Sequence, residues 1–381
     1  MTTVAPPPRA SSSPATAAVT SAVAPELRAS SRTRSADEEA RTAVQSPAAV
    51  VMVRPHHFTP NPQTAADNAF QTDPAEVDAT RAQLAARAFD EVTRAAEALR
   101  AAGVTVHLVD DERTDRPDGV FPNNWFSTHD DGRVVLYPMH SPNRRGERRT
   151  DVVDLLRERY LVTEVLDRSP LERHGIVVEG TGALVLDHVG RVAYVALSHR
   201  ADRAAVALVC SDLGHEPVTF TATDATGVPI YHTNVMMSVA SRFALVGLES
   251  IESTSERRRV VERLTASGRE VVALTRAQLG EFAGNALELA GADGPVLAIS
   301  ARGWASLTTA QRRTISRHAR PLPLDVPTIE LAGGSVRCMI AGVHLDRRPE
   351  QLPEPGENVV AINVDDPVTP DGRYVDGNAQ D

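Results

Sequence analysis

The chain has 381 residues, a formal net charge of −10 and only 4% aromatic residues, and all 40 of its basic residues other than histidine are arginine. An acidic chain without a basic block disfavours nucleic-acid binding, and the absence of lysine excludes Schiff-base, pyridoxal-phosphate and P-loop lysine chemistry. No apolar run is long enough to span a membrane, and two cysteines do not make a disulfide framework, so we expect a cytoplasmic protein.

Composition divides the chain into three parts. Residues 1–47 are rich in Ala, Ser, Thr and Pro, which predicts a disordered leader. A transit peptide is the alternative for this leader, but no convincing amphipathic helix supports it. Residues 48–347 carry the apolar segments and predict one domain with a large core. Residues 348–381 predict a partly disordered acidic tail.

The apolar pattern predicts a strand–helix–strand unit and then a series of hairpins. The first unit has strands at 49–53 and 105–109 around a helix at 74–102, for which Asp73 is the predicted N-cap. Hairpins are predicted at 120–139, 178–197, 234–250, 285–300 and 328–345.

A helix and a return strand are predicted after each of the first four hairpins. The helices span 151–160, 201–213, 253–267 and 306–319, and the return strands span 161–166, 217–220, 270–274 and 322–326. Gly214 and Gly268 fit helix-ending positions, and Ser306 or Thr308 fits the start of the last helix. The fifth hairpin has no helix after it, so the first unit is expected to complete the fifth module. The fold class predicted is therefore α/β, a ring of five ββαβ modules closed through the chain ends.

Polar residues recur along this pattern at nearly constant intervals. Asn124, Glu179, His232, Asn285 and Cys338 are separated by 55, 53, 53 and 53 residues. This spacing indicates that each module places one polar group at a shared centre. However, Cys338 is predicted to open the second arm of its hairpin, whereas Glu179 and Asn285 open first arms, so the spacing is expected to be partly fortuitous.

Taken one by one, these residues have structural as well as catalytic explanations. Cys338 follows Gly333, Gly334 and Ser335, a flexible turn rich in backbone donors, whereas Cys210 lies in an apolar helix face and is expected to be structural. A core role would equally explain His232, Glu179 or Asn285, and for Asn285 we rank it above pocket lining. The histidines lack metal-ligand spacing, so neither a metal nor a cofactor is predicted.

Five motifs in order resemble those of arginine deiminases. Each motif has its counterpart in this chain. Phe121–Phe126 is similar to the deiminase segment around an acidic clamp, Val178–Leu186 to the segment with a Glu-Gly pair, Ser198–Arg200 to a Ser-Glu-Arg, His232–Asn234 to a His-Leu-Asp, and Gly333–Met339 to the segment of the terminal cysteine. The chain thus resembles the amidinotransferase superfamily of guanidino-modifying enzymes, which also includes the dimethylargininases. The resemblance implies the pentein fold, a five-bladed α/β propeller. The segments Met52–Phe58 and Phe121–Phe126 are most similar to the branch of citrulline-utilisation hydrolases.

The resemblance also implies a role for each matching residue. Cys338 would be the nucleophile that attacks the central carbon of a guanidino or ureido group. His232 would protonate the departing nitrogen and then activate water, and Glu179 would orient His232. The expected substrate-binding residues are Asn123, Asn124, Asn234 and, for the substrate carboxylate, Arg200.

Two departures from the deiminase pattern bear on the substrate. Asn124 and Asn234 stand where deiminases have aspartates, and an amide brings no charge to bind a guanidinium. This favours citrulline or another ureido compound over arginine. Arg337, just before the cysteine, is a further difference and is expected to be an outward-facing strand residue.

Other functions remain open at this point. An amidinotransferase would use the same cysteine and histidine to pass an amidino group to an amine. A non-catalytic interaction module is a candidate of another class, but the joint presence of Cys338, His232 and Glu179 argues against it. The expected partner is a small guanidino or ureido amino acid, with no nucleic acid or membrane, and a homo-oligomer is compatible with the sequence.

Overall fold

The computed structural model describes residues 44–65, 68–72 and 77–349. Most of the expected leader, the tail from residue 350 and the proposed cap Asp73 lie outside these residues. Within the described ranges, no helix combines the length and apolar character needed to cross a bilayer.

Five separate three-stranded mixed sheets form the framework of the fold. In each sheet a first strand pairs antiparallel with a middle strand, and the middle strand pairs parallel with a third. In the order first, middle, third, the sheets are β3 (Phe126–Thr128), β4 (Arg133–Leu136), β5 (Glu164–Asp167); β6 (Val185–Asp187), β7 (Val192–Ala196), β8 (Glu216–Phe220); β9 (Met237–Val239), β10 (Phe243–Val246), β11 (Glu270–Ala273); β12 (Leu287–Gly291), β13 (Gly294–Ser300), β14 (Arg320–Leu324); and β15 (Ala341–Val343), β1 (Ala49–Pro55), β2 (Thr105–Asp111).

Helices connect the middle strand of each sheet to its parallel third strand, since a parallel pair needs a long crossover. These helices are α3 (Arg81–Ala101), α4 (Thr150–Arg159), α6 (Arg203–Leu213), α7 (Thr254–Ala266) and α10 (Thr309–Ser316). Shorter elements are η2 (Pro122–Asn124), η3 (Pro142–Glu147), η4 (Ser169–His174), α5 (Gly180–Ala183), η5 (Thr233–Val235), η6 (Leu248–Ser250), α8 (Arg276–Gly280), α9 (Ala301–Ser306) and α11 (Pro327–Glu330).

Local capping explains where the crossover helices begin and end. The side chains of Asp202, Ser253 and Thr308 accept hydrogen bonds from first-turn N–H groups, and Gly214 ends α6 in the left-handed conformation. Two predicted boundaries were wrong. Helix α3 begins after Thr80, which forms a capping box with Gln83, rather than at residue 74. The helix predicted over 306–319 is the shorter α10, which begins after the expected cap Thr308 and ends at Ser316, and a separate helix, α9, precedes it.

The two ends of the domain share one sheet. Val50 of β1 is opposite Gly342 of β15 and is also paired with Val106 of β2. This confirms that the N-terminal strand–helix–strand unit completes the fifth module. The hairpin predicted over 328–345 was wrong: the helix α11 and turns precede the single strand β15, because β1 already supplies its antiparallel partner.

This pairing also corrects the expectation about Cys338. Because β15 occupies the place of β3, β6, β9 and β12, Cys338 precedes a first strand just as the other four polar residues do. The even spacing therefore reflects equivalent positions in the modules rather than chance.

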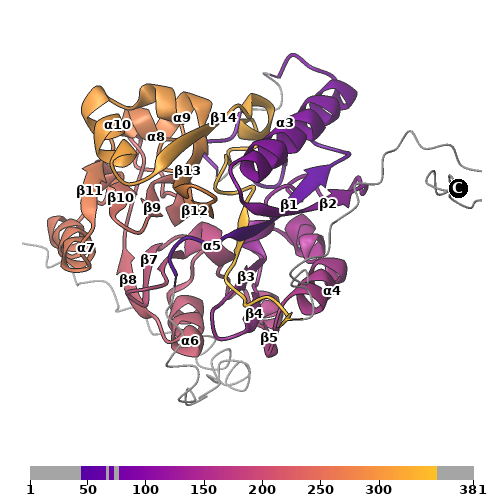
Figure 1. The fold of residues 1–381 in the computed structure, drawn as a ribbon, viewed down its shortest axis with the longest axis horizontal. Coiled ribbons are helices and arrows are strands. Elements are labelled where there is room, and N and C mark those ends of the chain that lie inside the picture. Colours follow the sequence, from indigo (N-terminus) through magenta and orange to yellow (C-terminus); the bar gives the residue numbers. More distant parts are fainter. Residues whose placement is uncertain (1–43, 66–67, 73–76, 350–381) are drawn as a thin grey trace, which may run out of the picture.

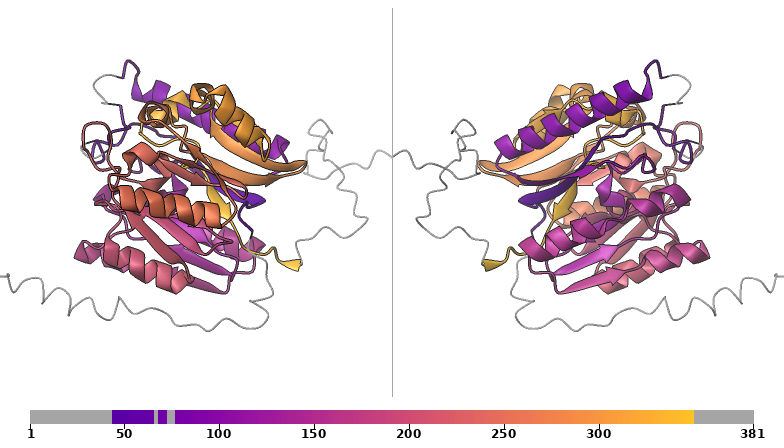
Figure 2. Two further views of the ribbon diagram at one scale, coloured as in Figure 1. Left: turned by 90° about the vertical axis from the view of Figure 1, so that its left-hand side faces the viewer. Right: turned by 90° about the vertical axis from the view of Figure 1, so that its right-hand side faces the viewer.

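The modules lie beside one another in chain order. β3 contacts β15, β6 contacts β9, and β9 contacts β12. The N–H of Ala290 donates to the carbonyl of Pro47, and α3 lies beside β14, so the fourth module also contacts the N-terminal unit (Figure 2). Figure 1 shows the crossover helices at the periphery and β3, β9 and β12 nearer the middle. Among the described residues no sheet closes on itself.

Candidate active site

Each of the five evenly spaced polar residues is held at the turn that leads into a first strand. Asn124 ends the turn η2 before β3, Glu179 is the N-cap of α5 before β6, and His232 is the N-cap of η5 before β9. Asn285 and Cys338 precede β12 and β15. All five are buried, so the repeated topology delivers two amides, a carboxylate, an imidazole and a thiol to the interior.

Cys338 receives two side-chain hydrogen bonds at its sulfur. The Nδ2 groups of Asn234 and Asn285 donate to Sγ over 3.3 Å and 3.2 Å. The backbone N–H of Cys338 donates to the carbonyl of Ser335 at 2.9 Å, which holds the thiol in its turn. Two amide donors stabilise a thiolate more than a thiol because the ionised sulfur is the stronger acceptor.

His232 and Glu179 form a buried pair. Nε2 of His232 lies 2.8 Å from Oε2 of Glu179, and the other carboxylate oxygen accepts the backbone N–H of His140 at 2.9 Å. Burial lowers the pKa of His232 to about 4, and the hydrogen bond to Glu179 opposes this shift only in part. At neutral pH the imidazole is therefore uncharged. With Nε2 held by Glu179, Nδ1 is the ring nitrogen left to exchange a proton.

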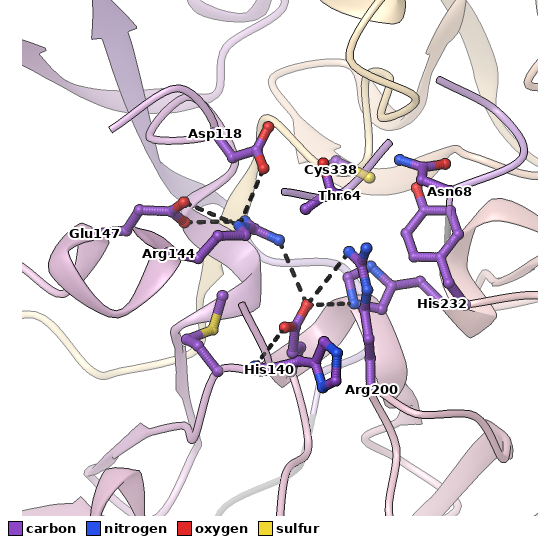
Figure 3. A network of polar contacts seen from close by, with 12 residues as sticks. Thr64, Asn68, Asp118, His140, Arg144, Glu147, Arg200, His232 and Cys338 are labelled. Carbon is purple, nitrogen blue, oxygen red and sulfur yellow. Dashed lines mark hydrogen bonds and ion pairs between the residues drawn. The ribbon is translucent and has the colours of Figure 1, made fainter. Parts of the chain in front are cut away.

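Two buried arginines surround the carboxylate of Glu179 (Figure 3). Arg144 donates to Oε2 at 3.4 Å, and the Arg200 guanidinium lies 3.8 Å from the same oxygen. Burial alone would raise the pKa of Glu179, but the hydrogen bond from His232 and the charges of both arginines hold that pKa well below its usual range. Glu179 is therefore ionised whenever the protein is folded near neutral pH.

Arg144 and Arg200 are themselves fixed by other groups. Arg144 forms a paired hydrogen bond with Glu147, both distances being 2.9 Å, and its Nε lies 3.3 Å from Asp118. The guanidinium of Arg200 stacks over the ring of Tyr231 at 4.7 Å from its centroid. The charged side chains are thus held in place before any ligand binds.

The thiol of Cys338 and the imidazole of His232 line the same small cavity. It is lined by Thr64, Asn68, Asp118, Phe121, Asn124, Arg144, Arg200, Tyr231, His232, Ala332, Gly334 and Cys338. Glu179 is not part of this lining, but it contacts three residues that are: His232, Arg144 and Arg200.

The four residues predicted to bind substrate occupy different places. Asn124 and Arg200 line the cavity, whereas Asn234 contacts the sulfur. Asn123 does not line the cavity; its carbonyl accepts the hydroxyl of Thr181, and its side-chain amide has no hydrogen-bond partner among the described residues. Oδ1 of Asn124 and Oδ1 of Asn234 likewise have no hydrogen-bond partner among the residues that the structure describes.

Several residues at the cavity were not identified from the sequence. Thr64, Asn68 and Asp118 belong to loops and Arg144 to the short turn η3, and none of them follows a periodic pattern. The Arg-x-x-Glu spacing of Arg144 and Glu147 is the one signal that could have indicated an ion pair. Asn285 was expected to be mainly structural. It does donate to the carbonyl of Asn234 at 3.1 Å, but it also contacts Sγ of Cys338.

Among the residues the structure describes, no group of three or more His, Cys, Asp and Glu side chains is arranged to hold a metal ion.

The chain matches a family model over residues 54–345, and that family is described as N,N dimethylarginine dimethylhydrolase, eukaryotic. Comparison with curated protein sequences gave no match.

Three solved structures illustrate the likeness in fold. The product-bound N-terminal domain of ArgZ, an arginine dihydrolase from the ornithine–ammonia cycle in cyanobacteria, is 17% identical with a TM-score of 0.60, over 77% of this chain and 97% of that one. AgrE in a ternary complex with ornithine and NAD+ is 18% identical with a TM-score of 0.62, over 79% of this chain and 40% of that one. An adduct of dimethylarginine dimethylaminohydrolase is 14% identical with a TM-score of 0.51, over 77% of this chain and 98% of that one.

Proposed function

The chain belongs to the N,N dimethylarginine dimethylhydrolase family of the amidinotransferase superfamily, and from this we propose that it is a cysteine-dependent hydrolase of a C–N bond in a guanidino or ureido compound. One observation carries the cysteine mechanism: Cys338, with two amide donors on its sulfur, lines the same cavity as His232, which is paired with Glu179. The closed five-bladed propeller and the single catalytic domain over 48–347 belong to the same proposal.

In the first step Sγ of Cys338 attacks the central carbon of the substrate group. The thiol proton passes to Nδ1 of His232 and then to the nitrogen that leaves as an amine or ammonia, so a C–S bond forms as a C–N bond breaks. The resulting imidazolium is stabilised by the Glu179 carboxylate, whose low pKa keeps it ionised. The product of this half-reaction is a covalent thiouronium or thiocarbamate on Cys338.

In the second step water replaces the sulfur. Neutral His232 takes a proton from water as its oxygen attacks the same carbon, and the C–S bond breaks to return the thiol. A guanidino substrate would leave as a ureido product. A ureido substrate would leave as a carbamate, which decomposes to an amine and carbon dioxide.

The amides of Asn124 and Asn234 are the feature that favours a neutral ureido group over a guanidinium. Oδ1 of Asn124, at the cavity, and Oδ1 of Asn234, beside the sulfur, can accept N–H donors without adding charge. Asp118 also lines the cavity: its Oδ2 lies 3.3 Å from Arg144, which balances its charge, and its Oδ1 has no hydrogen-bond partner among the described residues. Arg200 would bind the carboxylate of an amino-acid substrate. We therefore place citrulline ahead of arginine and of methylated arginine as the substrate.

The proposal is tested by incubating the protein with citrulline, arginine and dimethylarginine in turn and measuring ornithine, citrulline, ammonia and methylamines. Ornithine and ammonia from citrulline would support the ureido hydrolase, whereas citrulline formed from arginine or dimethylarginine would establish guanidino hydrolysis and contradict the amide argument. Transfer to an added amine would identify an amidinotransferase.

The two cysteines provide a matched control for this experiment. The Cys338→Ala variant should lose all turnover, while Cys210→Ala should keep it, because Cys210 is buried in α6 away from the cavity. Turnover that survives in Cys338→Ala would exclude the proposed mechanism.

A further inference from the structure

A second cavity lies next to the nucleophile without being part of the site described above. Its lining shares no residue with the first cavity, yet it includes Arg337, the residue immediately before Cys338. The expectation that Arg337 is an outward-facing strand residue was wrong: it precedes β15 in a turn, is half-buried and faces this second cavity.

Among the described residues, no carboxylate forms an ion pair with Arg337. Its Nη1 donates to the carbonyl of Ile340 at 2.8 Å, and within the described part of the chain no acidic side chain lines the cavity. Burial lowers the pKa of Arg337 to about 10, and only Cys338 acts in the opposite direction. A guanidinium with spare donors and no counter-ion is a binding group for an oxyanion.

The other walls of the cavity combine apolar side chains with polar groups that carry no charge near pH 7. Ser238 contributes a buried hydroxyl, and the rings of His188 and His344 stack at 3.8 Å along one side. Both imidazoles are neutral near pH 7 because burial lowers their pKa values, that of His344 to about 4. The carboxylate that acts on His344 is Asp130, and it is paired with Arg191 at 2.6 Å. The charge of the cavity is therefore positive and comes from Arg337.

One side chain connects this cavity to the reactive sulfur. The backbone N–H of Arg337 donates to Oδ1 of Asn285 at 3.0 Å, and Nδ2 of the same amide donates to Sγ of Cys338 at 3.2 Å. A ligand that moves the backbone of Arg337 thereby moves a hydrogen-bond donor of the thiolate.

We propose that the second cavity is a binding site for a small oxyanion, a phosphate or a carboxylate, held by the side chains of Arg337 and Ser238, and that its occupancy changes the reactivity of Cys338. This site does not depend on the proposed hydrolase function, because binding and thiol reactivity are both measured without substrate.

The test titrates inorganic phosphate into the full chain by calorimetry at pH 7 and constant ionic strength. We expect one saturable site in the unaltered protein, and binding weakened at least about tenfold in Arg337→Met, a change typical of losing a charge-assisted hydrogen bond. The matched control is Arg203→Met, which removes an exposed arginine of α6 and should leave binding unchanged. A wild type without saturable binding, or an Arg337→Met variant that binds equally well, would overturn the site.

The Ser238→Ala variant provides a second test of the site in case the arginine variant does not fold. If circular dichroism shows that Arg337→Met is unfolded, a several-fold loss of phosphate affinity in Ser238→Ala supports the site, and unchanged affinity refutes it. The link to the nucleophile is read from the rate of Cys338 alkylation by iodoacetamide, followed by mass spectrometry. We expect saturating phosphate to change this rate in the wild type and not in Arg337→Met; an unchanged wild-type rate would refute the link.

Discussion

At the residue scale, the two cysteines show that burial alone does not identify a nucleophile. Both thiols are buried, but Cys210 lies among apolar side chains of α6, where burial raises its pKa to about 12. Cys338 instead receives amide donors from two different modules. The difference between a structural thiol and a reactive one is thus the set of polar neighbours.

Asn285 provides the first prediction at this scale. The Asn285→Ala variant should alkylate at Cys338 about tenfold more slowly, because a hydrogen bond to a charged group contributes on the order of 1.5–3 kcal/mol. Asn285→Asp should be slower still, since it places a carboxylate beside the thiolate. The rates are measured with iodoacetamide at pH 7; equal rates in all three proteins would show that the amide has only a structural role.

Glu179 provides the second prediction at the residue scale. Glu179→Gln preserves the shape of the side chain but removes the charge that stabilises imidazolium at His232. We expect kcat to fall by about 10² or more, the range of a general acid–base contribution, with a smaller change in KM. Steady-state kinetics test this with whichever of citrulline, arginine and dimethylarginine the wild type turns over, and a variant that loses affinity alone would indicate that Glu179 serves binding rather than proton transfer.

At the element scale, the short helix α5 determines how closely two modules approach at the cavity. Gly180, its first residue, has a φ of +42°, and Gly182 lies against Asn124 and His232. A side chain at Gly182 would collide with Oδ1 of Asn124 and lie 2.8 Å from Nδ1 of His232. The glycines of the Val178–Leu186 motif therefore leave room for the base.

This packing predicts that Gly182→Ala reduces turnover at least tenfold while the fold survives, because the added methyl group displaces His232. Gly280→Ala in α8 is the matched control: its new methyl group meets no atom within 4 Å and activity should be unchanged. Turnover and thermal unfolding are measured for both. Full activity in Gly182→Ala would mean that the position of His232 is not critical.

At the scale of the whole molecule, burial of histidines makes stability depend on pH. The pKa values of His215, His232 and His344 are lowered to about 4 chiefly by burial, and those of His129 and His188 lie well below their usual value. Unfolding releases these rings to water, where they bind protons near pH 6.5. The unfolded chain therefore holds more protons than the folded one, and stability must fall as the pH decreases from about 6.5 towards 4.

Each such histidine should contribute up to about 1.4 kcal/mol of lost stability per pH unit in this window. Glu179 adds a loss only below its ordinary pKa of 4.5. Urea unfolding at pH 7, 6 and 5 measures the slope. His215→Asn, which keeps a donor for the carbonyl of Leu213, should show a shallower slope, and an unchanged slope would exclude His215 as a source.

The sequence by itself determined the framework of the protein. Apolar periodicity, the helix signals Thr308 and Gly214, and the even spacing from Asn124 to Cys338 are local or repeated features, so they predicted five modules and the completion of the last one by the N-terminal unit. The motifs around Cys338, His232 and Glu179 also pointed to the family.

Only the tertiary structure decided which polar groups meet. The contacts of Cys338 with Asn234 and Asn285, the arginines around Glu179, and the exposure of Arg337 to a separate cavity all join residues from different modules. The first strand of the last module was mistaken for a second arm because its partner, β1, lies almost 300 residues earlier in the chain. Such contacts depend on the direction of each side chain after the modules have packed, and no local pattern in the sequence encodes that direction.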